Sequence, residues 1–258
     1  HRLFFHKLGT KQAEDAILFG DQEKRRYVGG YVSDDNRYLF ISAANSTSGN
    51  ELYLKDLSVP NSPIVAIHKG FEYDFDVLDN IGTTLFIVTN LKAPNKRIVT
   101  VDVANPGVEN WKDLIPETEQ VLNPSTGAGY IFANYMKDAV SVVKQFDYKG
   151  KLIRTIALPG VGTASGFGGK AKDKELYFSF TNYVTPGTTY TFFPDSGKSS
   201  VYVKPKVDFV SENYESKQVF FTSKDGTKVP MIITHKIGLQ LNGKNPTILY
   251  GYGGFNVS

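Results

Sequence analysis

A pattern that recurs every 46 residues limits the possible folds of this chain more than any other feature of its sequence. Four short runs of aliphatic and aromatic residues carry it, at 38–41, 84–87, 130–133 and 176–179. Each run has a phenylalanine in its third position, and 46 residues separate each of these from the next: Phe40, Phe86, Phe132 and Phe178. Three equal intervals are hard to obtain by chance, even in a chain with 18 phenylalanines. We therefore expect repeated structural units in which these phenylalanines occupy equivalent strand positions.

A second strand-like run follows each of the first runs at the same period, at 51–56, 97–102, 142–147 and 189–193. Turn residues separate the runs, as at 33–36 and 172–174, and a weaker strand precedes and follows each pair. Four strands in a unit of this length are typical of a β-propeller blade, whose repeats run about 40 to 50 residues. A long β-sandwich with accidental spacing is the alternative. A helical solenoid fits worse, because the runs are short and rich in β-branched and aromatic residues.

The repeat also predicts how many units the chain contains. Residues 1–20 match only the later half of a unit, and four whole units begin near Tyr27, Gly70, Glu119 and Gly162 and end near Lys206. The expected fold class is therefore all-β, with half a blade and four four-stranded blades of a truncated propeller. We also expect that the natural N-terminus precedes His1, since the first residues already resemble a strand and not a signal peptide.

The sequence changes character after Lys206, where the period ends. Residues 219–235 predict a β-hairpin, because Asp225-Gly226 is a strong turn signal between two strand-like runs. Residues 247–250 are almost wholly apolar and predict a strand buried on both faces. We therefore expect two domains, a propeller over 1–206 and the first strands of a second domain over 207–258.

Composition excludes several classes of function. The chain has no cysteine, so it has no disulfide, thiol nucleophile or cysteine-bound zinc. Its formal net charge of +3 is scattered along the sequence, which argues against a nucleic-acid or anionic-membrane partner. No window approaches the roughly 18 apolar residues of a membrane-spanning helix. The compartment, cytoplasmic or periplasmic, stays undecided.

Two segments near the C-terminal end, 225–231 and 249–256, resemble the beginning of the peptidase domain in the prolyl oligopeptidase family. The resemblance extends back through 8–10, 33–35 and 71–74. It implies a seven-bladed propeller followed by an α/β-hydrolase domain, and a serine endopeptidase that cleaves proline-containing oligopeptides after proline. The propeller would restrict access to the active site. The resemblance also implies a monomeric parent protein without a cofactor. The rival hypothesis is a non-catalytic propeller that serves as a binding module.

The loop after residue 250 holds the candidate site residues. Its glycines allow a close approach to a reacting carbonyl. The resemblance implies that the hydroxyl of Tyr252 donates to the oxyanion and that Phe255 lines the substrate pocket. A strand-end tyrosine with a satisfied hydroxyl and an ordinary core phenylalanine are the alternatives.

The remaining catalytic groups are not expected in this sequence. It contains no Gly-x-Ser-x-Gly motif, and we interpret Ser165, beside Gly166, as a loop residue. The four histidines lack the paired spacing of a metal site and are interpreted as structural or surface residues. We therefore expect the Ser/Asp/His triad outside this sequence and no peptidase activity from residues 1–258 alone.

Overall fold

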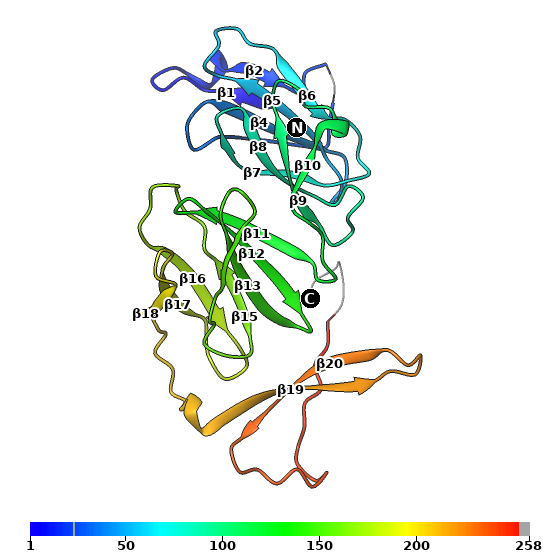
Figure 1. Cartoon of the computed structure of the whole chain (residues 1–258), viewed down its shortest axis with the longest axis vertical. Coiled ribbons are helices and arrows are strands. Elements are labelled where there is room, and N and C mark those ends of the chain that lie inside the picture. Colours follow the sequence, from blue (N-terminus) through cyan, green and yellow to red (C-terminus); the bar gives the residue numbers. More distant parts are fainter. Residues whose placement is uncertain (23, 253–258) are drawn as a thin grey trace.

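The computed structural model describes residues 1–22 and 24–252, and most of its regular elements are β-strands (Figure 1). Four four-stranded antiparallel sheets follow one another along the described chain. The first contains β3 (Tyr27–Val32), β4 (Tyr38–Ala44), β5 (Glu51–Asp56) and β6 (Ile64–His68). The second contains β7 (Phe75–Ile81), β8 (Thr84–Thr89), β9 (Arg97–Asp102) and β10 (Lys112–Ile115).

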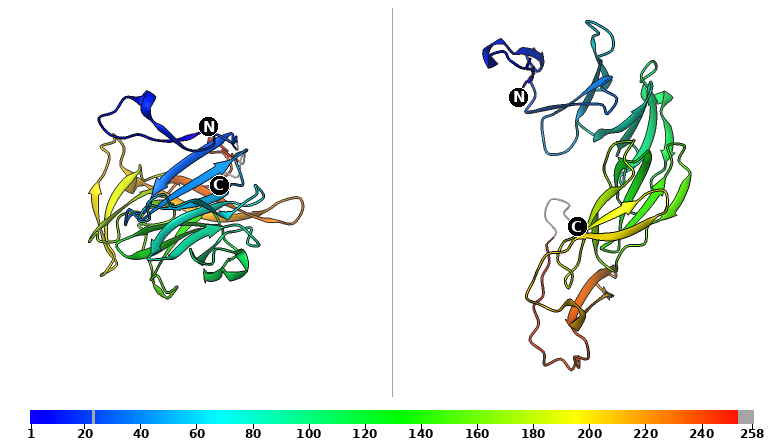
Figure 2. Two further views of the ribbon diagram at one scale, coloured as in Figure 1. Left: turned by 90° about the horizontal axis from the view of Figure 1, so that it is seen from above. Right: turned by 90° about the vertical axis from the view of Figure 1, so that its left-hand side faces the viewer.

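The third sheet contains β11 (Leu122–Gly127), β12 (Tyr130–Lys137), β13 (Val140–Phe146) and β14 (Leu152–Thr155). The fourth contains β15 (Thr163–Gly166), β16 (Leu176–Thr181), β17 (Thr188–Phe193) and β18 (Lys198–Val203). Within each sheet the strands are ordered as in the chain. The sheets lie along a curved path (Figure 2). The all-β fold with repeated four-stranded sheets is as the repeat predicts.

Shorter elements complete the described chain. The half unit expected at the start is a two-stranded sheet of β1 (Leu3–Phe5) and β2 (Ala16–Phe19). Three single-turn 3-10 helices connect strands: η1 (Gln12–Glu14), η2 (Val108–Asn110) and η3 (Ser211–Asn213). In the part of the chain that the structure describes, no helix is long and apolar enough to cross a membrane.

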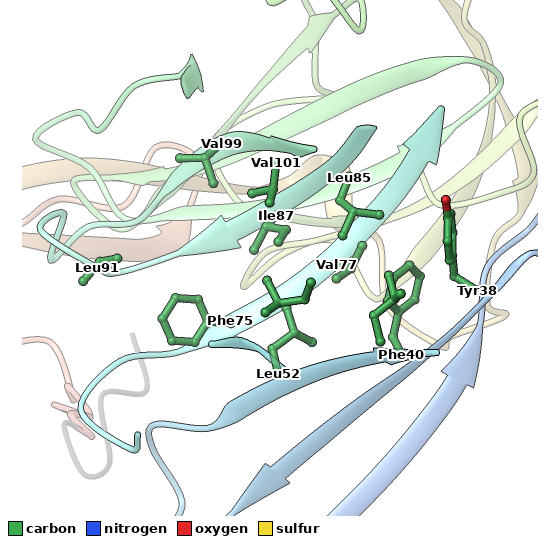
Figure 3. Close-up of a cluster of buried hydrophobic side chains, with 12 residues drawn as sticks. Tyr38, Phe40, Leu52, Phe75, Val77, Leu85, Ile87, Leu91, Val99 and Val101 are labelled. Carbon is green, nitrogen blue, oxygen red and sulfur yellow. The ribbon is translucent and has the colours of Figure 1, made fainter. Parts of the chain in front are cut away.

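Apolar side chains from consecutive sheets meet and form the core. Figure 3 shows the first such interface, where Phe40 and Leu52 from the first sheet face Phe75, Leu85 and other residues of the second. Further clusters join the second sheet to the third and the third to the fourth, and another joins the β1–β2 sheet to the first sheet. The first three sheets therefore bury both faces, which explains why their second strands are apolar at nearly every position.

The four repeated phenylalanines confirm the predicted strand positions but not a common face. Each is the third residue of the second strand in its sheet. Phe40, Phe86 and Phe132 pack against the following sheet, whereas Phe178 faces back and packs with Phe132 between the third and fourth sheets. Because neighbouring residues in a strand point to opposite faces, the fourth unit is out of phase by one residue.

The expected hairpin is present after the fourth sheet, but the expected apolar strand is not. β19 (Tyr214–Thr222) pairs with β20 (Lys228–Lys236) around a turn in which Gly226 has a φ of +88°. Residues 247–250 form no strand, and Ile248, Leu249 and Tyr250 are exposed. The prediction for this segment is therefore wrong for the described chain. A strand of that composition needs partners on its edges and faces, and no strand of the described residues pairs with it.

Candidate functional site

The strands of the four sheets run between two opposite ends of the array, which we call poles. The β19–β20 hairpin lies beside one of them. The turn between β12 and β13 contacts the hairpin that leads to the candidate loop, because the side-chain amide of Gln218 donates a hydrogen bond to the carbonyl of Asp138. We call this end the hairpin pole. The first strands β3, β7 and β11 begin there, since Leu122 at the start of β11 pairs with Tyr135 near the end of β12. They end at the opposite pole.

Tyr252 lies beyond the hairpin, in the last described residues. Its side chain is 61% exposed, and no hydrogen bond of its hydroxyl is found among the described residues. The adjacent Gly251 has open space where a Cβ would lie. Phe255 lies outside the described residues. The structure therefore shows an accessible Tyr252 and does not bring it together with a substrate pocket.

The other polar residues singled out in the sequence lie apart from Tyr252. The interpretation of Ser165 as a loop residue is wrong. Ser165 is part of β15, where it pairs with Ser179. The histidines pair locally: His6 with Asp15 at 2.7 Å, for example, while the His68 ring packs on Phe75. In residues 1–22 and 24–252, no three His, Asp or Glu side chains are grouped so that they could hold a metal ion.

A buried ion pair stabilises the hairpin pole of the first sheet. The Arg25 guanidinium donates to both carboxylate oxygens of Glu51, at 2.8 and 3.3 Å, and the Tyr53 hydroxyl donates to the same carboxylate at 3.0 Å. Burial opposes ionisation of Glu51, but the hydrogen bonds from Arg25 and Tyr53 outweigh it and hold the pKa of this carboxyl below its ordinary value. Arg25 also lies over the ring of Phe71, 5.3 Å from its centroid.

A tyrosine joins the first strands of the first two sheets, a contact that no pattern in the sequence predicts. The Tyr31 hydroxyl of β3 donates to the Val77 carbonyl of β7 at 2.8 Å and accepts from the Val77 amide at 3.1 Å. The carboxylate of Asp76 is 3.2 Å away. Burial and the nearby carboxylate raise the pKa of Tyr31. Burial also raises the pKa of Asp76, despite the opposing hydrogen bond from Tyr31 and the charge of Lys96.

This contact depends on an irregularity in β7. The pairing of β7 with β8 shifts register between Val77 and Asp79, as in a β-bulge, so Leu78 has no partner of its own in β8. The Leu78 carbonyl instead accepts from the hydroxyl of Thr126 in β11, at 3.2 Å. The Tyr148 hydroxyl donates to the carboxylate of Asp79. Side chains of the first and third sheets therefore both fasten β7.

Two cavities flank this fastened strand, and Leu78 lines both. The larger, of about 370 Å³, lies at the opposite pole, where β3, β7 and β11 end and residues 169–171 follow β15. The smaller, of about 310 Å³, lies toward the hairpin pole and is lined by Asn50, Asp76, Lys96 and Asn123 among others. Both are polar recesses along the first strands of consecutive sheets.

Comparison with known proteins identifies the architecture. The sequence profile described as "Prolyl oligopeptidase, N-terminal beta-propeller domain" matches residues 1–205. The chain belongs to the prolyl oligopeptidase family. The four-stranded sheets thus form part of the β-propeller domain of a prolyl oligopeptidase, as the resemblance in the sequence implies.

Its relatives among curated prolyl oligopeptidases are longer. A prolyl endopeptidase of Elizabethkingia miricola is 56% identical over 259 residues, a match that covers 100% of this chain and 37% of that protein. Prolyl oligopeptidase A of Galerina marginata is 32% identical, over 99% of this chain and 36% of that protein. The chain therefore spans little more than a third of the length of these relatives.

Solved structures of prolyl oligopeptidases have the same fold over most of the chain. The apo form of prolyl oligopeptidase B from Galerina marginata superimposes with a TM-score of 0.83 at 27% identity, covering 93% of this chain and 35% of that one. A structure from a study of inter-domain dynamics in two prolyl endopeptidases gives a TM-score of 0.81 at 32% identity, covering 92% and 35%.

Proposed function

We propose that this chain is part of a serine endopeptidase that cleaves short peptides after proline. The observation that carries the proposal is the match to a prolyl endopeptidase at 56% identity, which covers 100% of the chain and so extends past the propeller to the segment with Tyr252 and Phe255. A propeller that served only as a binding module would have no need of that loop. The substrates are proline-containing oligopeptides, and we propose a monomeric parent with no nucleic-acid or membrane partner.

The proposed division of labour places the propeller in residues 1–206 and the first strands of an α/β-hydrolase domain in 207–258. The four-stranded sheets and the β1–β2 sheet would be consecutive parts of a seven-bladed ring. The ring restricts the active site to peptides narrow enough to reach it. The contact of Gln218 with the β12–β13 turn supports a peptidase domain seated at the hairpin pole.

Tyr252 is the proposed oxyanion donor. Acyl transfer at a serine develops negative charge on the scissile carbonyl oxygen, and a phenolic hydroxyl held 2.7–3.1 Å from that position stabilises it, as is typical of such donors. Its exposure in this structure leaves the hydroxyl free to meet a substrate. Phe255 would offer an aromatic face to the proline ring. The nucleophile, its histidine base and the aspartate that orients the base would come from elsewhere in the parent protein.

Two measurements with a Gly-Pro chromogenic substrate test the proposal. Residues 1–258 alone should give no turnover, whereas the full-length parent should hydrolyse the substrate. In the parent, Tyr252→Phe should lower the single-turnover rate by about 10² to 10³-fold with little change in KM, because the lost bond forms mainly in the transition state.

Tyr250→Phe is the matched control, since it removes a hydroxyl two residues away from Tyr252, on an exposed side chain to which we assign no catalytic role. It should leave the rate within about twofold of the parent's. A change of less than threefold for Tyr252→Phe, or equal losses for the two variants, would remove Tyr252 from the mechanism. Turnover by residues 1–258 after contaminating proteases are removed would contradict the proposed location of the triad.

A further inference from the structure

The cavity at the opposite pole has the chemistry of a cation site. It lies between the ends of β3, β7 and β11, so four sheets contribute to its wall when residues 169–171 are included. It lies at the pole opposite the one that the β19–β20 hairpin contacts. Its lining residues include two aspartates, Asp34 and Asp79, as well as Tyr31, Asn80 and one lysine, Lys170.

Two carboxylates converge on this cavity from different sheets. Asp34 precedes β4 in the turn after β3, and its exposed side chain has no ion pair or hydrogen bond within the described residues. Asp79 is half-buried in β7, and each of its carboxylate oxygens accepts one hydrogen bond: Oδ2 from the Tyr148 hydroxyl and Oδ1 from the Asn80 main-chain amide at 2.8 Å. Burial is the largest cause that raises the pKa of the Tyr148 hydroxyl. The hydrogen bond to Asp79, the charge of Asp79 and the charge of Asp34 raise it further. Both negative charges therefore act on the hydroxyl of Tyr148, which donates to the lining residue Asp79.

The remaining lining favours an organic cation over a metal ion. Tyr31 is among the lining residues, and aromatic rings attract ammonium groups. No three acidic or histidine side chains in the described chain are arranged to bind a metal. Lys170 lowers the negative potential of the cavity, but no ion pair joins it to Asp34 or Asp79 among the described residues. An incoming cation would therefore meet the Asp34 carboxylate, which has no partner among the described residues, and the Asp79 carboxylate, whose oxygens each accept one hydrogen bond and can accept another.

We propose that this cavity binds the ammonium group of a peptide, either its N-terminus or a lysine side chain, through Asp34 and Asp79. A carboxylate that accepts from an ammonium forms a charge-assisted hydrogen bond, about twice as strong as a neutral one. Asn80 and Thr126 can accept further hydrogen bonds from the same group. The proposal rests on the proposed function only in taking peptides as the ligands.

Calorimetry on residues 1–258 tests this with three probes: tetra-alanine amide with a free N-terminus, its N-acetylated form, and the acetylated form with one alanine replaced by lysine. We expect the first or third probe to bind and the second to bind at least tenfold more weakly. Asp34→Asn should weaken binding about tenfold, which corresponds to roughly 1.4 kcal/mol. Lys170→Met should tighten it several-fold, because a competing cation is removed. The two variants therefore move the dissociation constant in opposite directions.

Asp208→Asn is the matched control: it removes an exposed carboxylate on the linker after β18 and should leave binding unchanged. Preference for the free N-terminus assigns the site to peptide termini, and preference for the lysine probe assigns it to side chains. Equal binding of all probes, no binding at millimolar concentration, or no effect of Asp34→Asn would overturn the proposal. These measurements involve no cleavage, so a negative result leaves the peptidase function standing.

Discussion

Removal of one hydroxyl, in Tyr31→Phe, should destabilise the junction between the first two sheets. Val77 is 4% exposed, and both its amide and its carbonyl bond to the Tyr31 hydroxyl, at 3.1 and 2.8 Å. The ring itself should stay in place, because it packs against Phe40 with centroids 5.4 Å apart. The variant therefore leaves two buried main-chain groups without their partner and creates no large cavity.

The expected loss follows from these contacts. A buried polar group left without a partner costs about 1 to 3 kcal/mol. Tyr31 itself is 40% exposed, so water can reach part of the vacated position. We therefore expect a decrease of about 2 kcal/mol in the free energy of unfolding, near the low end for two groups. Urea denaturation followed by tyrosine fluorescence measures it, and hydrogen exchange of the Val77 amide should accelerate by about 30-fold for the same energy.

Tyr27→Phe is the control for this prediction. Tyr27 lies in the same strand and is 39% exposed, but its hydroxyl has no hydrogen bond within the described residues. Its variant should change stability by less than about 0.5 kcal/mol. If the two variants lose the same stability, or if Val77 exchange is unchanged in Tyr31→Phe, the hydroxyl does not fasten β7.

Three further changes follow from backbone geometry and charge. Gly49→Ala should cost at least about 3 kcal/mol in urea unfolding, because a Cβ would lie 1.7 Å from the Phe71 carbonyl oxygen at a φ of +74°; Gly226→Ala, with a φ of +88° and open space, should cost only about 1. Ala139→Gly should raise stability by about 0.5 to 1 kcal/mol, since Ala139 has a φ of 65° in the β12–β13 turn. Because the folded pKa of Glu51 lies below its ordinary value of 4.5, its contribution is present above that pH and lost as pH falls through the folded pKa. Glu51→Gln should therefore flatten the loss of urea stability below about pH 4.5, and an unchanged slope would contradict this.

The sequence predicted the sheets well because the spacing of apolar runs reflects strands that each blade must bury. It did not predict that Phe178 faces the preceding sheet. An interval counted along the chain does not tell how the loops turn a strand, and a shift of one residue moves a side chain to the opposite face. A local signal was available: Phe178 and Phe180 alternate with Tyr177 and Ser179, a pattern of one buried face, whereas the run around Phe40 is apolar throughout.

The candidate site was less accessible to sequence reasoning. Tyr252 was found through a motif, but the isolated apolar run before it cannot form a strand without neighbours, however strong its local preference. The contact of Tyr31 with Val77 depends on a register shift in β7 that no residue pattern announces. Asp34 and Asp79, 45 residues apart in the sequence, line one cavity only because successive first strands end at one pole.

The shared apolar interfaces also decide how this chain comes apart. Each cluster joins only consecutive sheets, so the array behaves as a row in which every unit is coupled to its nearest neighbours. Among the described residues, the first three sheets each lose two interfaces when they open, the fourth sheet and the β1–β2 sheet each lose one, and the β19–β20 hairpin contributes to none of these clusters. Opening therefore costs least at the hairpin and at the two ends of the array, which are the β1–β2 sheet and the fourth sheet, and most in the first three sheets, which include β7 and β11.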